Sequence, residues 1–365
     1  MLRRLYIDNF RCFVNFEYKP ERKQLLLGAN GSGKSSLLDA VRLMKLFLKG
    51  SNIPFTQSSR TRWLDQPLQV FEIEALIEDK LYGYRAEIRY SPKTNVPTVS
   101  LERLNVDGAP VFELVDGEMR SFLDGKSQTV VLRGEANESS LQFWSYANPP
   151  VGRFVKWMDS IHCFKIDAYE DKMEETADSI LVSPDYEMEY IASWYRHLNE
   201  SDPDGMDAFR ASMREVLTGF QNLRLSSEDD GVRKLRADFA SPTQRKLTLS
   251  LHELSDGQRV LLALYMILHF LVAKGCTVFI DEPDNFVSLR EIQPWLLAAQ
   301  ASVEDHGGQL ILISHHPEIL DQWANAYGLR FFREENGHVR TEKFKSDYDG
   351  LLRPSELVAR GWENE

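Results

Sequence analysis

The stretch from Gly28 to Ser35 constrains the fold more than any other part of the chain. It reads G-A-N-G-S-G-K-S and fits the pattern G-x-x-x-x-G-K-[ST] in full. The stretch Q-L-L-L, residues 24–27, precedes it, and a helical pattern over residues 37–48 follows it. A strand, a glycine-rich loop and a helix in this order form a phosphate-binding loop, so we expect an α/β domain.

Each residue type in this loop has a chemical reason. Glycines let the backbone curl so that successive N–H groups point at one anion, and the following helix directs its positive dipole end there. Lys34 supplies a mobile charge for the terminal phosphates, and Ser35 offers a hydroxyl to Mg²⁺. The nucleotide contacts predicted for the loop are Asn30, Gly31, Ser32, Gly33, Lys34, Ser35 and Ser36.

Two carboxylates end an apolar strand later in the chain. Residues 277–280 read T-V-F-I, and D-E-P-D follows. Such a strand places Asp281 at the carboxyl edge of a parallel sheet, where α/β folds bind ligands. We expect Asp281 to hold Mg²⁺ through water and Glu282 to accept the proton of an attacking water. The alternative is a strand that runs into an acidic turn, and the complete phosphate loop upstream favours the ligand site.

A second candidate anion site lies at L-S-D-G-Q-R, residues 254–259, directly before the apolar run 260–273. Ser255 stands where a helix N-cap is expected, and a capped helix N-terminus binds anions. We predict that Ser255, Gly257 and Gln258 contact a phosphate, although an ordinary N-cap is the alternative. One chain then has two anion-binding helix ends and one phosphate loop. A simple interpretation is that two subunits pair head to tail, each closing on the nucleotide of the other.

Hydrophobic periodicity predicts how these motifs are distributed over secondary structure. Strands predominate up to residue 133, helices over 140–220, and antiparallel strands over 223–251. Strands and helices then alternate to the end of the chain. The individual strands expected are 2–7, 12–18, 24–27, 70–77, 81–90, 277–280 and 309–313, and the later helices are 290–303 and one after Pro317.

The motif order resembles that of ABC-type ATPases: the glycine loop, then L-S-D-G-Q, then F-I-D-E-P, then I-L-I-S-H-H at 311–316. The resemblance implies an α/β fold, an ABC-type P-loop ATPase head with a β-rich N-terminal lobe and a helical and β insertion carrying the signature motif. It implies Mg²⁺-dependent ATP binding and hydrolysis, with His315 as the switch histidine at the γ phosphate. The expected parts are 1–140, 141–250 and 251–365.

Further residues indicate which branch of that family the chain resembles. L-Y-I-D-N-F-R-C-F, residues 5–13, is similar to the first strand of the SMC/RecF branch, which implies that Arg11 approaches the nucleotide, a surface arginine being the alternative. The chain has no sustained heptads. It resembles compact bacterial AAA/ABC ATPases of the abortive-infection and overcoming-lysogenization-defect group. That resemblance implies a homodimer or higher homo-oligomer and a separate effector, such as a nuclease or toxin, in antiviral (phage) defence.

Several residues depart from that pattern. Asp256 stands where many relatives have glycine, and its charge near a phosphate predicts slower hydrolysis or a weaker closed dimer. Ser288 replaces a histidine, and Gln142 is the candidate for the lid glutamine. The tail F-K-S-D-Y-D-G-L-L-R-P-S-E-L-V-A-R-G-W, residues 344–362, is expected to form a docking segment or to pack on the core.

Net charge and cysteine content limit the alternative functions and the expected cellular location. A net charge of -12 argues against a generally basic nucleic-acid coat but allows a local basic patch. One alternative is therefore a RecF-like DNA-repair ATPase, and another is a nucleotide-sensing scaffold with little turnover. Three widely separated cysteines fit a reducing cytosol, and the run 260–273 is too short to span a bilayer, so we expect a cytoplasmic protein without a membrane partner. The candidate DNA-binding residues are Arg3, Arg4, Arg11, Arg22 and Lys23.

Overall fold

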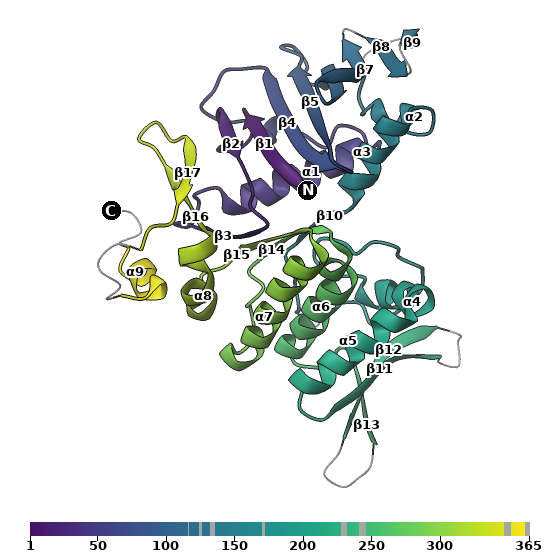
Figure 1. The fold of residues 1–365 in the computed structure, drawn as a ribbon, viewed down its shortest axis with the longest axis vertical. Coiled ribbons are helices and arrows are strands. Elements are labelled where there is room, and N and C mark those ends of the chain that lie inside the picture. Colours follow the sequence, from purple (N-terminus) through teal and green to yellow (C-terminus); the bar gives the residue numbers. More distant parts are fainter. Residues whose placement is uncertain are drawn as a thin grey trace. The chain divides into compact units, whose positions relative to one another are not determined.

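The chain forms two compact units in the computed structural model (Figure 1). The first unit comprises Met1–Ile161, Ala326–Asp349 and Leu357–Glu365, and the second comprises His162–Asn325 and Gly350–Glu356. The structure describes residues 1–115, 117–123, 126–131, 136–169, 172–227, 232–240, 246–346 and 352–361. The mixed α/β fold expected from the sequence is confirmed. The division of the chain at residues 140 and 250 stays a prediction.

An antiparallel sheet dominates the first unit, with strand order β2-β1-β4-β5-β6-β7-β8-β9. The residues of β4 and β5 alternate between a buried and a solvent-facing side, as the sequence predicted. On the buried side Phe154 of α3 stacks on Tyr84 of β5, with ring centroids 5.4 Å apart. The strands are β1 (Leu2–Asp8), β2 (Phe16–Tyr18), β4 (Leu68–Ile77), β5 (Lys80–Tyr90), β6 (Pro97–Val106), β7 (Ala109–Val115), β8 (Glu118–Leu123) and β9 (Lys126–Val131).

The strand predicted over residues 12–18 is wrong in its first half. Residues 9–15 form a turn instead, in which Asn9, Arg11 and Asn15 all have positive φ and Phe10 bridges to Phe13. Positive φ is rare in strands, so these positions cannot continue the ladder. The turn brings the residues after β1 back toward the phosphate loop.

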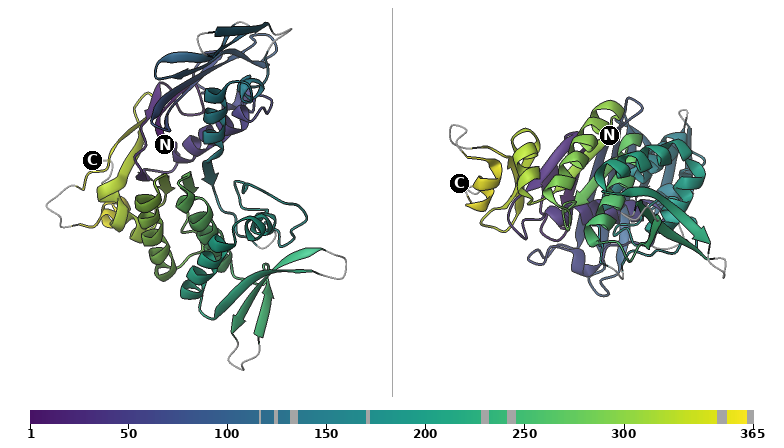
Figure 2. Two further views of the ribbon diagram at one scale, coloured as in Figure 1. Left: turned by 45° about the vertical axis from the view of Figure 1, so that its right-hand side comes forward. Right: turned by 90° about the horizontal axis from the view of Figure 1, so that it is seen from below.

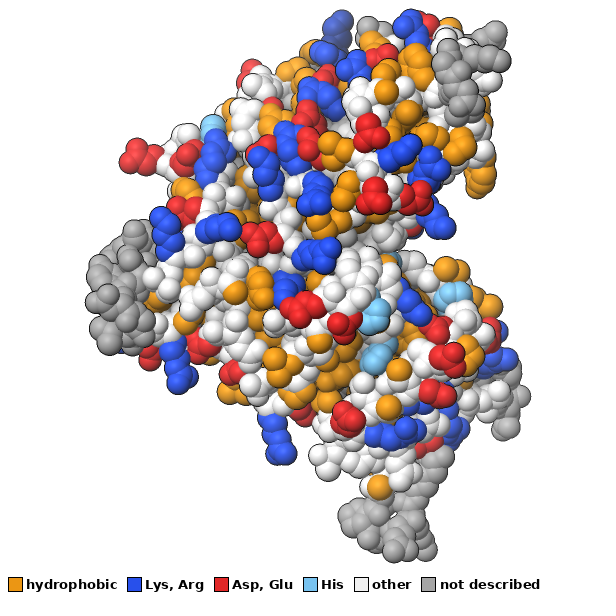
Figure 3. Space-filling model, viewed as in Figure 1, with side chains coloured by type: hydrophobic (Ala, Val, Ile, Leu, Met, Phe, Trp, Pro, Cys, Tyr) orange, Lys and Arg blue, Asp and Glu red, His pale blue; other side chains and the backbone are white. Residues whose placement is uncertain are grey.

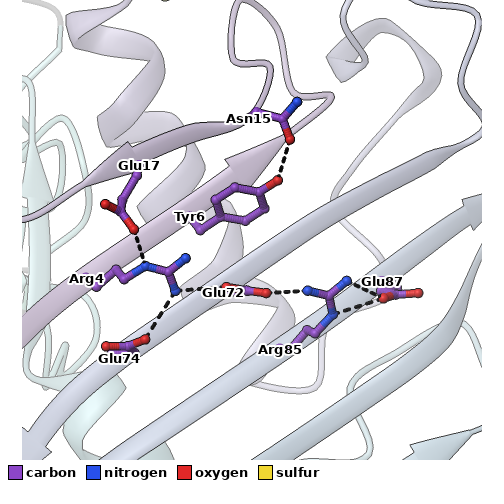
Figure 4. Close-up of polar contacts among 8 residues, drawn as sticks. All are labelled: Arg4, Tyr6, Asn15, Glu17, Glu72, Glu74, Arg85 and Glu87. Atoms are coloured by element: carbon purple, nitrogen blue, oxygen red, sulfur yellow. Dashed lines mark hydrogen bonds and ion pairs between the residues drawn. The ribbon is translucent and has the colours of Figure 1, made fainter. Parts of the chain in front are cut away.

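The other face of this sheet carries a ladder of charges (Figure 4). Arg4 donates to Glu17 and Glu72 at 2.6 and 2.8 Å and to Glu74 at 3.2 Å. Arg85 continues the ladder by pairing with Glu72 and with Glu87. Exposed ion pairs of this kind each contribute little stability, but they neutralise the arginines.

A second group of strands in the first unit holds the phosphate loop. β16 (Gly328–Arg333) runs parallel to the fully buried β3 (Lys23–Leu27) and antiparallel to β17 (Val339–Lys343). Parallel strands end at the same edge, so β16 and β3 deliver their C-terminal residues to one place. The helices of this part of the chain are α1 (Lys34–Leu48), η1 (Gln57–Ser59), α2 (Leu141–Trp144) and α3 (Pro149–Asp159).

The second unit is built around the parallel pair β14 (Thr277–Asp281) and β15 (Gln309–Ile313), both buried throughout, in which Asp281 is level with Ile313. A separate antiparallel sheet contains β11 (Phe220–Ser227), β12 (Arg233–Ala240) and β13 (Lys246–Ser250) (Figure 2). Strand β10 (Ile161–Phe164) follows α3. The later helices are α4 (Ile191–Ser201), α5 (Pro203–Val216), α6 (Asp256–Phe270), η2 (Val272–Lys274), α7 (Leu289–His306), α8 (Pro317–Tyr327) and α9 (Pro354–Ala359).

The structure shows what surrounds two segments whose role the sequence left open, the apolar run before residue 275 and the C-terminal tail. The stretch Asp256–Lys274 is long and apolar enough to cross a membrane, but 72% of it is buried inside the protein, as in a core helix. In the described part of the tail, the Ser355 N–H donates to Asp321 of α8 at 2.9 Å and Leu357 is buried. Residues 352–361 therefore pack on the protein, the second of the two predicted arrangements, while 347–351 and 362 lie outside the described residues.

We expect Glu102→Ala to lower the free energy of unfolding by roughly 3 kcal/mol, because it leaves several buried donors without an acceptor. Glu102 of β6 is fully buried and accepts hydrogen bonds from Ser139, Ser140 and Tyr84 at 2.5, 2.8 and 2.8 Å. Burial raises the pKa of its carboxyl. Denaturant unfolding is the measurement. Glu118→Ala, at an exposed ion pair, is the control, with a change within about 0.5 kcal/mol.

Candidate nucleotide-binding site

The glycine loop has the backbone geometry that a phosphate cradle requires. Gly28, Gly31 and Gly33 have φ values of 132°, 79° and 110°, a region that favours glycine. A Cβ on Gly28 would lie 2.2 Å from the carbonyl oxygen of Phe331, so only glycine fits there. The loop joins β3 to α1, which begins at Lys34. This backbone conformation is suited to a phosphate, and the contacts predicted for residues 30–36 stay a prediction.

The ammonium of Lys34 lies against the loop itself. Its Nζ donates to the carbonyl oxygens of Gly28 and Ala29 at 2.6 and 3.2 Å, and the residue is only 6% exposed. The charge is therefore held at the glycine loop, the region where phosphates are predicted to bind.

The turn after β1 packs against the same loop. A Cβ on Gly33 would lie 3.0 Å from the sulfur of Cys12, and the Cys12 thiol hydrogen-bonds Ser36. Next to it, Arg11 forms an ion pair with Asp39 of α1. Arg11 thus lies beside the first turns of α1, and its predicted approach to a nucleotide stays a prediction.

Arg333, at the end of β16, is a residue that sequence reasoning missed. Its Nε and one terminal nitrogen both donate to the carbonyl oxygen of Gly31, at 2.9 and 2.8 Å. The arginine is exposed and holds the tip of the loop. No motif marks it, because the two residues are 302 positions apart in the sequence. The only available signal was an arginine at the end of a strand.

In the second unit, the N-terminus of α6 has the predicted donors. The Ser255 hydroxyl accepts from the Gln258 N–H at 3.3 Å, and the Gln258 side chain accepts from the Ser255 N–H at 3.0 Å, a capping box. A Cβ on Gly257 would lie 2.5 Å from the carbonyl oxygen of Phe286. Ser255 is exposed, and its hydroxyl, which accepts the Gln258 N–H, keeps a hydrogen that it can donate to an anion.

The charge of Asp256 is balanced within the same helix. Its carboxylate pairs with the guanidinium of Arg259, whose side chain is 3% exposed. Arg259 also donates to the carbonyl oxygens of Ala168 and Leu254 at 2.8 and 2.7 Å. The negative charge that motivated the prediction of slower hydrolysis is therefore countered by a buried arginine.

The ends of β14 and β15 bring the remaining candidate residues together. Asp281 ends β14, and the N–H of Glu282 donates to Ile313 at 2.8 Å. Glu282 has a φ of 54°, and its carboxylate accepts from the Asn285 amide at 2.9 Å. His315 follows β15 and is exposed. Because the strands are parallel and in register, Asp281, Glu282 and His315 leave the same edge.

The predicted Mg²⁺ ligands have suitable chemistry. Ser35 offers a hydroxyl and Asp281 a carboxylate, both hard oxygen donors of the type that Mg²⁺ prefers. They belong to different units, so their meeting at one ion stays a prediction.

The assignment of Gln142 as lid glutamine is wrong for this conformation. Its side chain lies 3.3 Å from a Cβ placed on Gly50, just beyond the C-terminal end of α1. The loop is at the other end of this 15-residue helix, about 20 Å away at 1.5 Å per residue. Ser288, in place of a histidine, caps α7 through a capping box with Glu291.

These features define a P-loop nucleotide-binding protein. Residues 4–179 match a family described as an AAA domain, and residues 192–321 match one described as an AAA domain, putative AbiEii toxin, Type IV TA system. Over these two regions the chain is similar to AAA-domain ATPases, which agrees with the predicted resemblance to compact bacterial AAA/ABC ATPases.

Solved structures with a similar chain path include two SMC heads. The SMC head domain from Thermotoga maritima is 13% identical, with a TM-score of 0.49, and the match covers 94% of this chain and 99% of that chain. The Smc head domain with an extended coiled coil, bound to the C-terminal domain of ScpA and derived from Pyrococcus furiosus, is 11% identical, with a TM-score of 0.49 and coverage of 100% and 99%. No curated protein matches the sequence.

We expect Arg333→Ala to weaken ATP binding roughly 5- to 30-fold. Loss of hydrogen bonds from a charged group costs about 1–2 kcal/mol, and here it frees the tip of the loop. Calorimetric titration with a non-hydrolysable ATP analogue measures this. Arg120→Ala, which removes an arginine from the exposed surface of β8, is the control and should bind normally. Equal affinity of both variants would contradict a role for Arg333.

Proposed function

We propose that the protein is a Mg²⁺-dependent ATPase that dimerises around ATP and thereby controls a separate effector protein. The observation behind the proposal is that the two helix N-termini marked by the motifs, α1 behind the glycine loop and α6 behind Ser255, lie in two different units. Only the first has a phosphate loop. Each subunit therefore binds ATP with its own loop and offers its α6 terminus to the nucleotide of the other.

The loop geometry supports ATP binding. Left-handed glycines turn backbone N–H groups inward, and Lys34 moves from the loop carbonyls to the terminal phosphates. Mg²⁺ neutralises phosphate charge when bound, and Ser35 and Asp281 are its proposed ligands.

The strand ends support hydrolysis. Glu282 accepts the proton of the attacking water, a role worth typically 10²–10⁴ in rate. His315 donates to the γ phosphate. The Asn285 amide binds one oxygen of Glu282, and the carboxylate can accept the water at its other oxygen.

The α6 terminus supports closure on a second copy. The capping box orients Ser255, and glycine at 257 lets the first turn of α6 pack directly on the carbonyl oxygen of Phe286, which fixes the position of this helix end. The pairing of Asp256 with Arg259 removes the main reason to expect a scaffold with little turnover.

The choice of an effector over DNA rests on the family match and on charge. The region 192–321 matches a family whose description names a putative AbiEii toxin, which supports a toxin-like or nuclease partner in phage defence. The candidate basic face is largely occupied: Arg4 pairs with three glutamates, Arg11 pairs with Asp39, and Lys23 is buried over the ring of Tyr327. Figure 3 shows positive and negative side chains interspersed on the visible face of the first unit.

Substitutions in the phosphate loop and at the proposed general base test the proposal. We expect Lys34→Ala to abolish ATP binding, because the loop loses its only mobile cation, while the exposed Lys19→Ala variant binds normally.

We expect Glu282→Gln to bind ATP, to lose turnover by at least 10²-fold, and to accumulate as a dimer with ATP and Mg²⁺.

Light scattering coupled to size exclusion measures this dimer. Adding Ser255→Arg to Glu282→Gln should abolish it without loss of ATP binding, because the larger side chain blocks the α6 terminus. An unchanged mass of Glu282→Gln with and without ATP would contradict the dimer, and normal ATP binding by Lys34→Ala would contradict the loop assignment.

A further inference from the structure

A part-buried side-chain hydrogen bond links the two turns that carry the candidate reacting groups. Ser314, the first residue after β15, is fully buried, and its hydroxyl donates to the carboxylate of Asp284 at 2.6 Å. Asp284 lies three residues beyond the end of β14. The same Ser314 hydroxyl accepts from the backbone N–H of His316 at 2.9 Å.

This arrangement fixes the backbone on both sides of His315. The hydrogen of the Ser314 hydroxyl is committed to Asp284, so its lone pair is oriented toward the N–H of His316. The ring of His316 in turn accepts from the N–H of Glu318 at 3.3 Å, at the start of α8. Residues 314 and 316 are thereby held, and this fixes the direction in which the Cα–Cβ bond of the exposed His315 leaves the backbone.

Strand pairing alone does not require this bond. β14 and β15 are already in register over their full length, and the Glu282 N–H adds one more backbone bond to Ile313. Burying a carboxylate is costly, and burial raises the pKa of Asp284. An apolar pair would fill the space without this cost, so the polar pair serves the conformation of the turn more than the stability of the fold.

We propose that Asp284 is a positioning residue, which acts through Ser314 to hold His315 in the geometry needed at the terminal phosphate. The inference rests on the proposed function and deepens it, because it names how the end of β14 controls the orientation of the switch histidine. Asp284 itself touches neither the nucleotide nor water in this mechanism.

The test measures ATP turnover in a set of variants. Asp284→Ala should lower kcat 10- to 100-fold with KM for ATP changed less than about 3-fold, since a misplaced group of this kind costs up to about 10² in rate. Asp284→Asn should keep at least a third of the wild-type kcat, because the amide oxygen accepts the same bond. Asp321→Ala, which removes an aspartate that binds the Ser355 N–H on α8, is the matched control and should keep normal turnover.

A double-mutant cycle separates positioning from a general structural effect. In a His315→Ala background, Asp284→Ala should lower kcat no further, because the group that it positions is absent. Ser314→Ala should behave like Asp284→Ala in both backgrounds, and thermal unfolding should show that each variant is folded.

Three results would overturn the inference: normal kcat in Asp284→Ala, an equal loss in Asp284→Asn, or a full additive loss in the His315→Ala background. Each leaves ATP hydrolysis itself intact. Absence of turnover in the wild-type protein would instead refute the proposed function, and the inference with it.

Discussion

The close approach of β16 to the start of the glycine loop sets the geometry of the candidate site in the first unit. The carbonyl oxygen of Phe331 lies where any side chain on Gly28 would be, so the loop begins in contact with a neighbouring strand. That contact brings Arg333 within reach of Gly31. On the opposite side, Cys12 closes against Gly33. The loop is therefore shaped by segments from both ends of the chain as well as by its own glycines.

In the second unit the corresponding constraint is the register of β14 with β15. Because Asp281 is level with Ile313, the residues that follow each strand are neighbours. The carboxylates of the D-E-P-D segment and the histidines after β15 can then be linked through side chains, and the Asp284–Ser314 bond is such a link. Catalytic geometry at this edge thus depends on backbone pairing that is already complete within the strands.

Local patterns predicted the elements, and long-range contacts explain what they missed. Alternating apolar and polar residues identified β4 and β5, and short apolar runs identified β3, β14 and β15. These patterns are local because burial of one or both faces of a strand selects its residue types within a few positions. Gln142 was misplaced because its chain position says nothing about which end of α1 it contacts. Arg333 and the Arg259 partner of Asp256 were missed because charge pairing depends on the folded backbone.

The roles of the candidate residues are a different matter from their positions. The structure pairs Arg11 with Asp39 of α1, and it brings Asp281, Glu282 and His315 to one strand edge. It gives Ser255 the cap that its sequence position indicated. Which of these groups contact a nucleotide depends on how the units and the copies of the chain close on one another, and such closure is encoded in surfaces that single-sequence patterns do not describe.

The contact of the Lys34 ammonium with Gly28 and Ala29 has a consequence for selectivity. A polyphosphate that bound at this loop would replace the two carbonyl oxygens as the partner of the ammonium. That exchange is the same for every nucleoside triphosphate. Discrimination between bases must therefore come from side chains outside the glycine loop.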